Sequence, residues 1–262
     1  MRILQVSVVY YPELHFGGPP QKIHALNRKL IERGHEVRVL TFHSERPGAN
    51  VVTELDGVGV RYLPWVGRAN WRTPRPFATF RDDIEWAEVI HLYGLYNLLG
   101  PPVARTARRL GRPYLLEPQG MFVPRARTQG AKRLYHLAVT RWLARDAAWV
   151  IAHSVAEKKE LAAIAPAEHI AVRRNGIDVE AFRNLGSGDG FRREIDATPD
   201  ERIVLFIGRI SPIKNLETLV RAFAQAPLPA TRLALVGPLE DRAYVSAIER
   251  WRKSWAWRIA FA

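Results

Sequence analysis

Short apolar runs alternate with amphipathic helical patterns along the 262 residues, and this alternation predicts an α/β fold with parallel strands. The pattern begins afresh at residue 203, after a glycine-rich stretch at residues 186–190, which indicates a second domain. Apolar residues make up 47% of the chain and aromatic residues 10%, enough for a folded core rather than a disordered chain. We therefore expect residues 1–174 to form one domain, residues 175–200 a linker, and residues 201–262 an incomplete second domain.

The first domain is expected to consist of strand–helix units in regular order. A strand over residues 1–10 precedes a helix that Pro19 and Pro20 open and Gly34 ends, with Ile23 and Leu30 on its buried face. Further strands are expected at residues 37–42, 59–63, 88–92, 114–117, 149–152 and 170–173, and helices at residues 103–110, 131–145 and 155–163. This order is that of a Rossmann-like domain.

The second domain is expected to repeat the same order over a shorter length. Residues 203–207 predict a buried strand, residues 216–226 an amphipathic helix, residues 233–236 a strand, and a last helix begins near Asp241. Two strands and two helices are few for an independent core. The fold class is thus α/β with two Rossmann-like domains, the second incomplete.

Composition excludes several kinds of chemistry. The chain has no cysteine, which excludes disulfides and a cysteine nucleophile and suits a cytoplasmic protein. No apolar run approaches the roughly 18 residues of a membrane span, and residues 1–10 resemble a strand more than a secretion signal. The net charge of +13 comes from seven lysines and 32 arginines against 26 acids. Because so strong an arginine bias is typical of GC-rich genomes, charge alone is weak evidence for a nucleic-acid partner.

The segment 208–215, Gly-Arg-Ile-Ser-Pro-Ile-Lys-Asn, lies between the first strand and the first helix of the second domain. It places Arg209 and Lys214 close to a helix N-terminus, where free N–H groups and the helix dipole favour anions. Two cations in that field can hold a diphosphate, including one that leaves during group transfer. The alternative is a basic surface loop.

Gly17 and Gly18 stand where the first strand passes into the first helix. Without β-carbons, this backbone can approach a ligand closely at a helix start. The pair is not part of a G-x-G-x-x-G motif, and Thr41, Phe42 and His43 supply no acid for a ribose at the end of the second strand. A dinucleotide site is therefore disfavoured. The alternative is a glycine pair that only turns the chain.

Seven short motifs occur in one order that resembles the retaining, two-Rossmann-domain (GT-B) glycosyltransferases of the family-four type. They are Gly17-Gly18, residues 33–37 (RGHEV), residues 90–94 (IHLYG), residues 118–121 (PQGM), His153-Ser154, residues 175–178 (NGID), and Gly208-Arg209 with Lys214. The resemblance extends from Met1 to about Arg242.

The resemblance implies that the second domain binds a nucleotide-diphosphate-sugar and the first a glycan or lipid-linked glycan acceptor, with anomeric configuration retained. Arg209 and Lys214 would hold the donor diphosphate, and Gly17 and Gly18 would line the acceptor side. No metal or other cofactor is expected. Gln119 occupies the position of a common family histidine and can hydrogen-bond a sugar hydroxyl without exchanging a proton; His91 is the alternative, or a structural residue.

The family's glutamate pair, eight positions apart in the second domain, has no counterpart here. Glu160 and Glu168 have that spacing but precede residue 175, so we interpret the match as accidental. We therefore expect a C-terminally truncated family member with weak or absent turnover by itself. The alternative function is a non-catalytic remnant that binds a membrane or a partner chain.

Two segments combine cations with aromatic residues. Residues 61–81 contain five arginines, two tryptophans and two phenylalanines, which suits an anionic membrane on the cytoplasmic face or single-stranded nucleic acid. Packing of these aromatics beneath an arginine-rich loop is the favoured interpretation, and nucleic acid is an unlikely partner. In the last segment, Ile248, Trp251, Trp255 and Ile259 would share one helical face, either an interfacial anchor or the artefact of a truncated end. The oligomeric state is left open.

Overall fold

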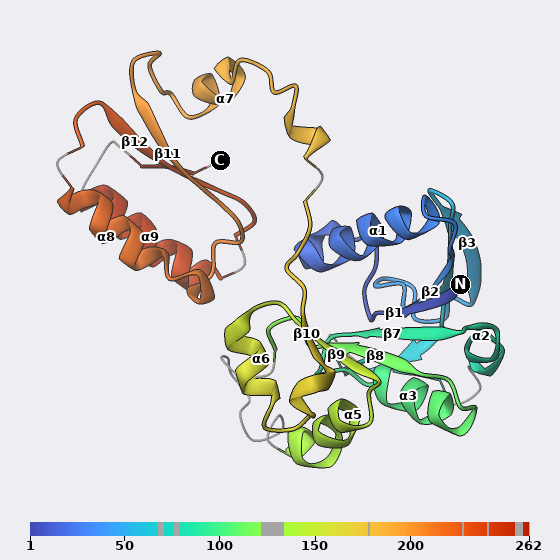
Figure 1. Ribbon diagram of the computed structural model, residues 1–262. Helices are drawn as coiled ribbons and strands as arrows, with labels where there is room; N and C mark the ends of the chain where they lie inside the picture. Colours follow the sequence, from blue (N-terminus) through green and yellow to red (C-terminus); the bar gives the residue numbers. More distant parts are fainter. Residues whose placement is uncertain are drawn as a thin grey trace. The chain divides into compact units, whose positions relative to one another are not determined.

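The chain divides into two compact units, Met1–Asp178 and Val179–Ala262. The structure, a computed structural model, describes residues 1–67, 71–75, 79–121, 134–177, 179–226, 228–239, 241–254 and 259–261 (Figure 1). Residues 175–177 of the expected linker belong to the first unit, and the short helices η5 (Glu180–Phe182) and α7 (Asp189–Glu194) belong to the second. The prediction of an α/β fold with parallel sheets is confirmed.

The N-terminal unit is built on one eight-stranded sheet with the strand order β10-β9-β8-β7-β1-β2-β4-β3. All neighbouring strands are parallel except the edge pair β3 and β4. The strands are β1 (Arg2–Val6), β2 (Glu36–Thr41), β3 (Val51–Leu55), β4 (Val58–Tyr62), β7 (Val89–Tyr93), β8 (Tyr114–Glu117), β9 (Trp149–Ala152) and β10 (Ile170–Val172). A separate small ribbon pairs β5 (Trp65–Val66) with β6 (Thr73–Pro74).

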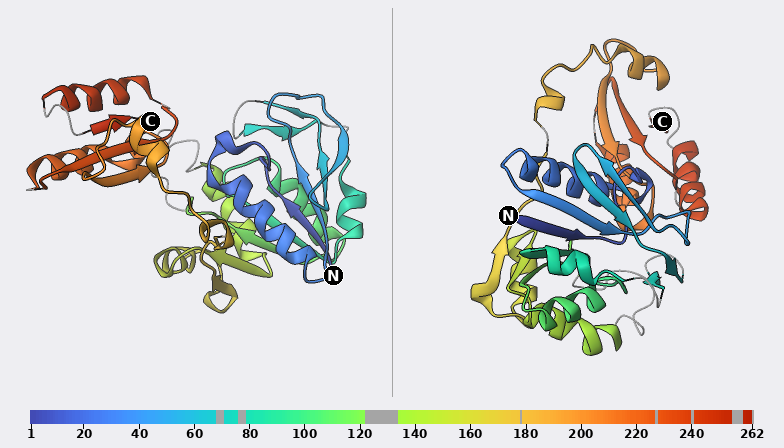
Figure 2. Two further views of the ribbon diagram at one scale, coloured as in Figure 1. Left: turned by 90° about the horizontal axis from the view of Figure 1, so that it is seen from above. Right: turned by 90° about the vertical axis from the view of Figure 1, so that its right-hand side faces the viewer.

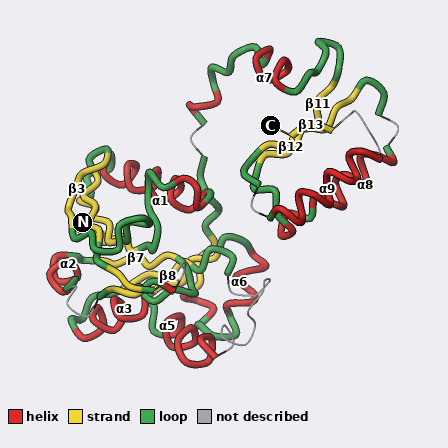
Figure 3. Tube along the Cα trace, turned by 180° about the vertical axis from the view of Figure 1, so that it is seen from behind, coloured by secondary structure: helices red, strands yellow, loops and turns green. Residues whose placement is uncertain are grey.

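Helices cover both faces of this sheet (Figures 1 and 2). Helix α1 (Gly18–Ile31) packs on one face, where Ile23 joins the core formed by β1, β2 and β4. Helices α2 (Arg81–Trp86), α3 (Gly100–Arg109), α5 (Arg141–Arg145) and α6 (Val155–Leu161) contribute to the larger core on the other face. A π-helical turn, His136–Thr140, leads into α5, and single 3-10 turns occur at Leu14–Phe16 and Ala167–His169. The layered arrangement of helices around strands is visible in Figure 3.

The C-terminal unit has a three-stranded parallel sheet with the order β11-β12-β13. Its strands are β11 (Arg202–Ile207), β12 (Thr231–Val236) and β13 (Ile259–Phe261), and its helices α8 (Leu216–Gln225) and α9 (Arg242–Ser254). The two helices lie side by side against one face of the sheet (Figure 1), where Val220, Phe223 and Ile248 pack on Leu233 and Leu235.

Several sequence-based boundaries were wrong. Strand β1 ends at Val6 instead of Tyr10, and α3 begins at Gly100, ahead of residue 103. Strand β3 and helix α2 were not expected at all. Part of the expected loose stretch 186–190 starts α7. Of the expected helix 131–145, residues 131–133 lie outside the described residues.

The expected helical face at the C-terminal end is not formed. Helix α9 ends at Ser254 and Ile259 lies in β13, so Ile248 and Ile259 do not share one helix. Ile248 is fully buried in the core of the unit. Trp255 lies outside the described residues. Ile248 and Ile259 therefore do not contribute to one helical face.

Some of the aromatic residues that the structure describes within residues 61–81 pack inward, in agreement with the favoured interpretation, and one does not. Trp65 and Phe80 pack against the larger core. The Arg72 guanidinium lies 4.6 Å from the Trp65 ring centroid and is only 8% exposed. Trp71 remains 39% exposed, and Arg68 and Phe77 lie outside the described residues.

Candidate functional site

The carboxyl ends of the parallel strands meet at one edge of the N-terminal sheet. The strand order reverses at β1, which has β2 on one side and β7 on the other. In open α/β sheets, ligands bind at this edge, beside the reversal of strand order. The polar residues that follow β1, β8, β9 and β10 are therefore the first candidates for a functional site.

The glycine pair lies at this edge, at the start of α1. Gly17 has a φ of +88°, a conformation that side chains with a β-carbon rarely adopt, and Gly18 is the first residue of the helix. A β-carbon built on Gly18 would meet no atom of the described residues within 4 Å. Gly17 is thus required by the backbone, whereas the space beside Gly18 is open to a ligand.

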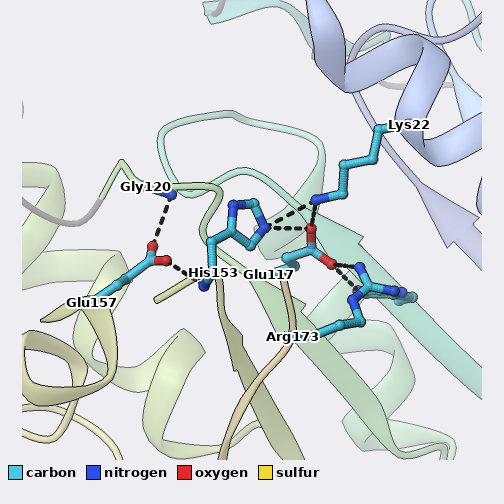
Figure 4. Close-up of polar contacts among 7 residues, drawn as sticks. Lys22, Glu117, Gly120, His153, Glu157 and Arg173 are labelled. Carbon is cyan, nitrogen blue, oxygen red and sulfur yellow. Dashed lines mark hydrogen bonds and ion pairs between the residues drawn. The ribbon is translucent and has the colours of Figure 1, made fainter. Parts of the chain in front are cut away.

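Glu117, the last residue of β8, is the centre of a buried ion-pair cluster (Figure 4). Its side chain is fully buried and accepts hydrogen bonds from Lys22 Nζ on α1 and from Arg173 Nη2 after β10. His153 Nε2, directly after β9, lies 2.8 Å from Oε1 of the same carboxylate. Three cationic or ionisable groups from three elements thus converge on one carboxylate.

His153 can exchange partners within this cluster. Its Nε2 lies 2.8 Å from Glu117 Oε1 and 3.0 Å from Lys22 Nζ. A ring nitrogen that carries a proton donates to the carboxylate, and one without a proton accepts from the ammonium. The His153 side chain is 20% exposed, so a ligand at the sheet edge can contact this ring.

Glu157 holds the backbone around this cluster. Its amide N–H donates to Ser154 Oγ at 3.1 Å, the capping-box contact at the start of α6. Its carboxylate accepts from the backbone N–H of His153 at 2.7 Å and from that of Gly120 at 2.8 Å (Figure 4). The turn after β8 and the turn after β9 are thereby tied together.

Electrostatics keep Glu117 ionised. Burial alone would raise its pKa, but the hydrogen bond from His153 and the nearby His91 and Arg173 outweigh it, so the pKa lies well below its usual range. Burial lowers the pKa of Lys22, and the hydrogen bond and charge of Glu117 partly oppose this. The cluster therefore holds the Lys22 ammonium, partly removed from water, next to the sheet edge.

His91 and Gln119, the two catalytic candidates, differ in their access to a ligand. His91 lies in the middle of β7, is 4% exposed, and its Nε2 is 3.2 Å from Glu117 Oε2 without hydrogen-bond geometry. Gln119 has a φ of +60° in the turn after β8 and is half-buried; its Nε2 has no hydrogen-bond partner among the described residues. Both nitrogens are buried, but Gln119 lies in a turn at the sheet edge, whereas His91 lies within β7 next to Glu117.

The cluster predicts a pH-dependent stability. Burial lowers the pKa of His91, so the unfolded chain takes up a proton before the folded one as the pH falls through about 6.5. The lowered pKa of Glu117 acts in the same direction below about pH 4.3. We expect urea denaturation to show a free energy of unfolding that falls from pH 7 to pH 5. The variant His91→Gln should flatten the dependence of the free energy of unfolding on pH. Replacement of His169, which is exposed, is the control and should leave this dependence unchanged. Equal pH dependence in the wild type and both variants would contradict the role assigned to His91.

In the C-terminal unit, the loop after β11 passes very close to the loop after β12. Gly208 has a φ of +154°, and a β-carbon on Gly237 would lie 2.3 Å from the Gly208 carbonyl oxygen. The backbone N–H of Ile210 donates to the Pro238 carbonyl at 2.9 Å. These contacts fix the course of residues 208–211 at the carboxyl edge of the small sheet.

Arg209 and Lys214 both belong to this loop. Arg209 is half-buried, and Lys214 is exposed at the end of the turn η6 (Pro212–Lys214), directly before α8. Asn215, the N-cap of α8, lies in the left-handed region and makes no side-chain cap hydrogen bond within the described residues. The structure thus places both cations in one loop at a helix N-terminus, as the sequence predicted.

The candidate residues form two groups. Gly17, Gly18, His91 and Gln119 lie in the N-terminal unit, and Arg209 and Lys214 in the C-terminal unit. Sequence reasoning missed Lys22, Arg173, Glu157 and the role of Glu117. Of these, only Glu157 had a local signal, the S-x-x-E spacing from Ser154.

Among the described residues there is no group of three or more His, Asp or Glu side chains that could hold a metal ion. No helix in the described part of the chain is both long and apolar enough to span a membrane. Asp83 on α2 is 8% exposed and forms an ion pair with Arg61 on β4.

A family model of glycosyltransferases, the family that the motifs resemble, matches the chain. The profile of the glycosyl transferase 4-like domain covers residues 17–176, which begin at the glycine pair and include the whole Glu117 cluster. The chain belongs to this family.

Curated relatives that match the chain include D-inositol 3-phosphate glycosyltransferases. The protein from Mycobacteroides abscessus is 27% identical over 234 residues, which are 80% of this chain and 50% of the relative. The protein from Mycobacterium tuberculosis is 26% identical over 234 residues, 79% of this chain and 46% of the relative. The chain spans about half the length of the curated relatives it matches.

Solved structures share the fold. The Anabaena protein Alr3699/HepE in complex with UDP and glucose is 18% identical, with a TM-score of 0.69 over 100% of this chain and 68% of that one. Sucrose-phosphate synthase from Thermosynechococcus elongatus is 21% identical, with a TM-score of 0.71 over 100% of this chain and 70% of that one. Both likenesses concern the fold.

Proposed function

We propose that this glycosyl transferase 4-like chain takes part in the transfer of a sugar from a nucleotide-diphosphate-sugar to a glycan or lipid-linked glycan acceptor. The family match over residues 17–176 carries the proposal. The relatives named glycosyltransferases align over four-fifths of the chain, which extends the likeness into the C-terminal unit.

The donor is assigned to the loop after β11. Arg209 and Lys214 would hold its diphosphate, since a guanidinium and an ammonium near a helix N-terminus stabilise a leaving anion. UDP and UDP-glucose are the first ligands to test because the Anabaena protein binds them. No metal ion is assigned a role.

The acceptor is assigned to the sheet edge of the N-terminal unit. Gly17 and Gly18 would let a sugar or phosphate approach the backbone of α1, and the Gln119 amide would donate to a hydroxyl. His91 would act behind Glu117, through the cluster. We further propose retention of the anomeric configuration and a cytoplasmic location, peripheral on the inner face of the membrane when the acceptor is lipid-linked.

The experiment is donor turnover. The full chain is incubated with UDP-glucose and with other nucleotide-sugars, and the release of nucleoside diphosphate is followed with and without a lipid-linked glycan acceptor. The proposal expects release from at least one nucleotide-sugar, faster with acceptor, and a product whose anomeric proton shows retention by NMR. No release of nucleoside diphosphate from any nucleotide-sugar, together with no binding of any of them in a calorimetric titration, would overturn it.

A further inference from the structure

A pocket of about 340 Å³ lies beside the Glu117 cluster, between α1 and the segment 173–177 that follows β10. It belongs wholly to the N-terminal unit. Its volume is near the lower end of that of small-molecule sites. Its lining consists of Lys22, Ala25, Leu26, Arg28, Lys29, Glu32, Arg173, Arg174, Gly176 and Ile177.

The charge of this lining is unbalanced. Five of the ten residues are cations and one is an acid, Glu32, which accepts from Lys29 Nζ at 2.7 Å. Glu117 is not part of the lining, but its carboxylate forms ion pairs with both Lys22 and Arg173. Arg28 and Arg174 are exposed and form no ion pair with any residue that the structure describes. Five cations therefore share two carboxylates, and the pocket keeps a positive excess.

Part of the wall is pre-organised. Lys22 and Arg173 are held in place by the buried Glu117 carboxylate, so a ligand does not have to immobilise either long side chain (Figure 4). A guanidinium has five N–H donors, and the contact with Glu117 leaves donors of Arg173 available. Arg28 and Arg174 add two more guanidinium groups, each of which can donate two parallel hydrogen bonds to a pair of phosphate oxygens.

We propose that this pocket binds a phosphate-bearing ligand. Lys22 and Arg173 would form its fixed inner wall, Arg28 and Arg174 would close on the phosphate oxygens, and Leu26 and Ile177 would contact the apolar part of the molecule. Ile177 is 76% exposed, so covering it by a ligand removes apolar surface from water. The lining residues belong to the N-terminal unit and the loop assigned to the donor diphosphate to the C-terminal unit, and the proposal does not depend on the proposed transfer reaction.

The test uses the full chain with Arg209→Ala and Lys214→Ala, so that the donor loop does not contribute. Inorganic phosphate and pyrophosphate are titrated by calorimetry at fixed ionic strength. Co-sedimentation with phosphatidylcholine vesicles, with and without phosphatidylglycerol, tests whether the phosphate belongs to a lipid headgroup. The pocket variant adds Arg28→Gln and Arg174→Gln; the control adds Arg109→Gln and Lys159→Gln, two exposed cations of the same unit that remove the same charge.

We expect binding that the pocket variant weakens by about tenfold or more and the control leaves unchanged, since each of the two arginines would donate charge-assisted hydrogen bonds to the phosphate. Binding of the soluble anions identifies a free phosphate compound, and binding only to phosphatidylglycerol vesicles identifies a headgroup; both outcomes support the site. No binding in either arm would overturn it, as would equal losses in pocket and control variants. Unchanged thermal unfolding midpoints would show that all variants are folded.

Discussion

Replacing Glu117 by glutamine is expected to lower the free energy of unfolding of the N-terminal unit by about 2–4 kcal/mol. The carboxylate is fully buried and is shared by Lys22, Arg173 and His153. Its removal leaves two cations without their counter-charge in a desolvated place. The expected loss is below that of a completely buried pair because the side chains of Lys22 and Arg173 are 14% and 34% exposed, and water can solvate them in part.

The matched control is Glu85→Gln, which removes a carboxylate paired with Arg81 on the exposed side of α2. Surface pairs of this kind contribute at most about 0.5–1 kcal/mol, so the control should unfold almost as the wild type does. Urea denaturation followed by circular dichroism measures both. Equal stability of Glu117→Gln and the wild type would mean that the cluster does not stabilise the sheet edge.

Replacing Arg209 by alanine is expected to weaken the binding of UDP by about tenfold, and Lys214→Ala by about three- to tenfold. Both side chains belong to the loop before α8, and each contributes charge-assisted hydrogen bonds to a diphosphate in the proposed site. The effect of Lys214 is smaller because this side chain is exposed and its charge is screened by water. Calorimetric titration of each variant gives the dissociation constants.

Arg193→Ala is the control for net charge, since Arg193 is an exposed cation on α7 of the same unit. It should bind UDP with the wild-type affinity. A loss in the control equal to that in Arg209→Ala would show that affinity follows overall charge and not this loop.

The fold could be predicted where hydrophobic periodicity is strong. The strands at the centre of the N-terminal sheet and helices α1 and α8 follow directly from apolar runs and from the proline and glycine positions. Strand β3 was not predicted because it is an edge strand that is exposed along most of its length, so its sequence shows no run of apolar residues typical of a buried strand. The shared helical face over residues 248–259 was misjudged because apolar residues at helical spacing do not mark where α9 ends, at Ser254, or where β13 begins, at Ile259.

The site could be predicted only in part, for a physical reason. Gly17, Gly18, Arg209 and Lys214 stand in short local motifs, and the structure places them in the loops expected of them. The Glu117 cluster joins residues 95 and 56 positions apart in sequence, Lys22 and Arg173 to Glu117. No local pattern marks such a contact; only the order of the strands, β10-β9-β8-β7-β1, brings the groups to one edge.

The most direct test of the central claim, that Arg209 and Lys214 hold a donor diphosphate, compares UDP with UMP on the wild-type chain and on the Arg209→Ala, Lys214→Ala double variant. The two nucleotides differ only in the second phosphate. We predict that UDP binds the wild type at least about tenfold more tightly than UMP and that this ratio approaches one in the double variant. An equal affinity of the wild type for both nucleotides, or a ratio unchanged in the variant, would contradict the claim.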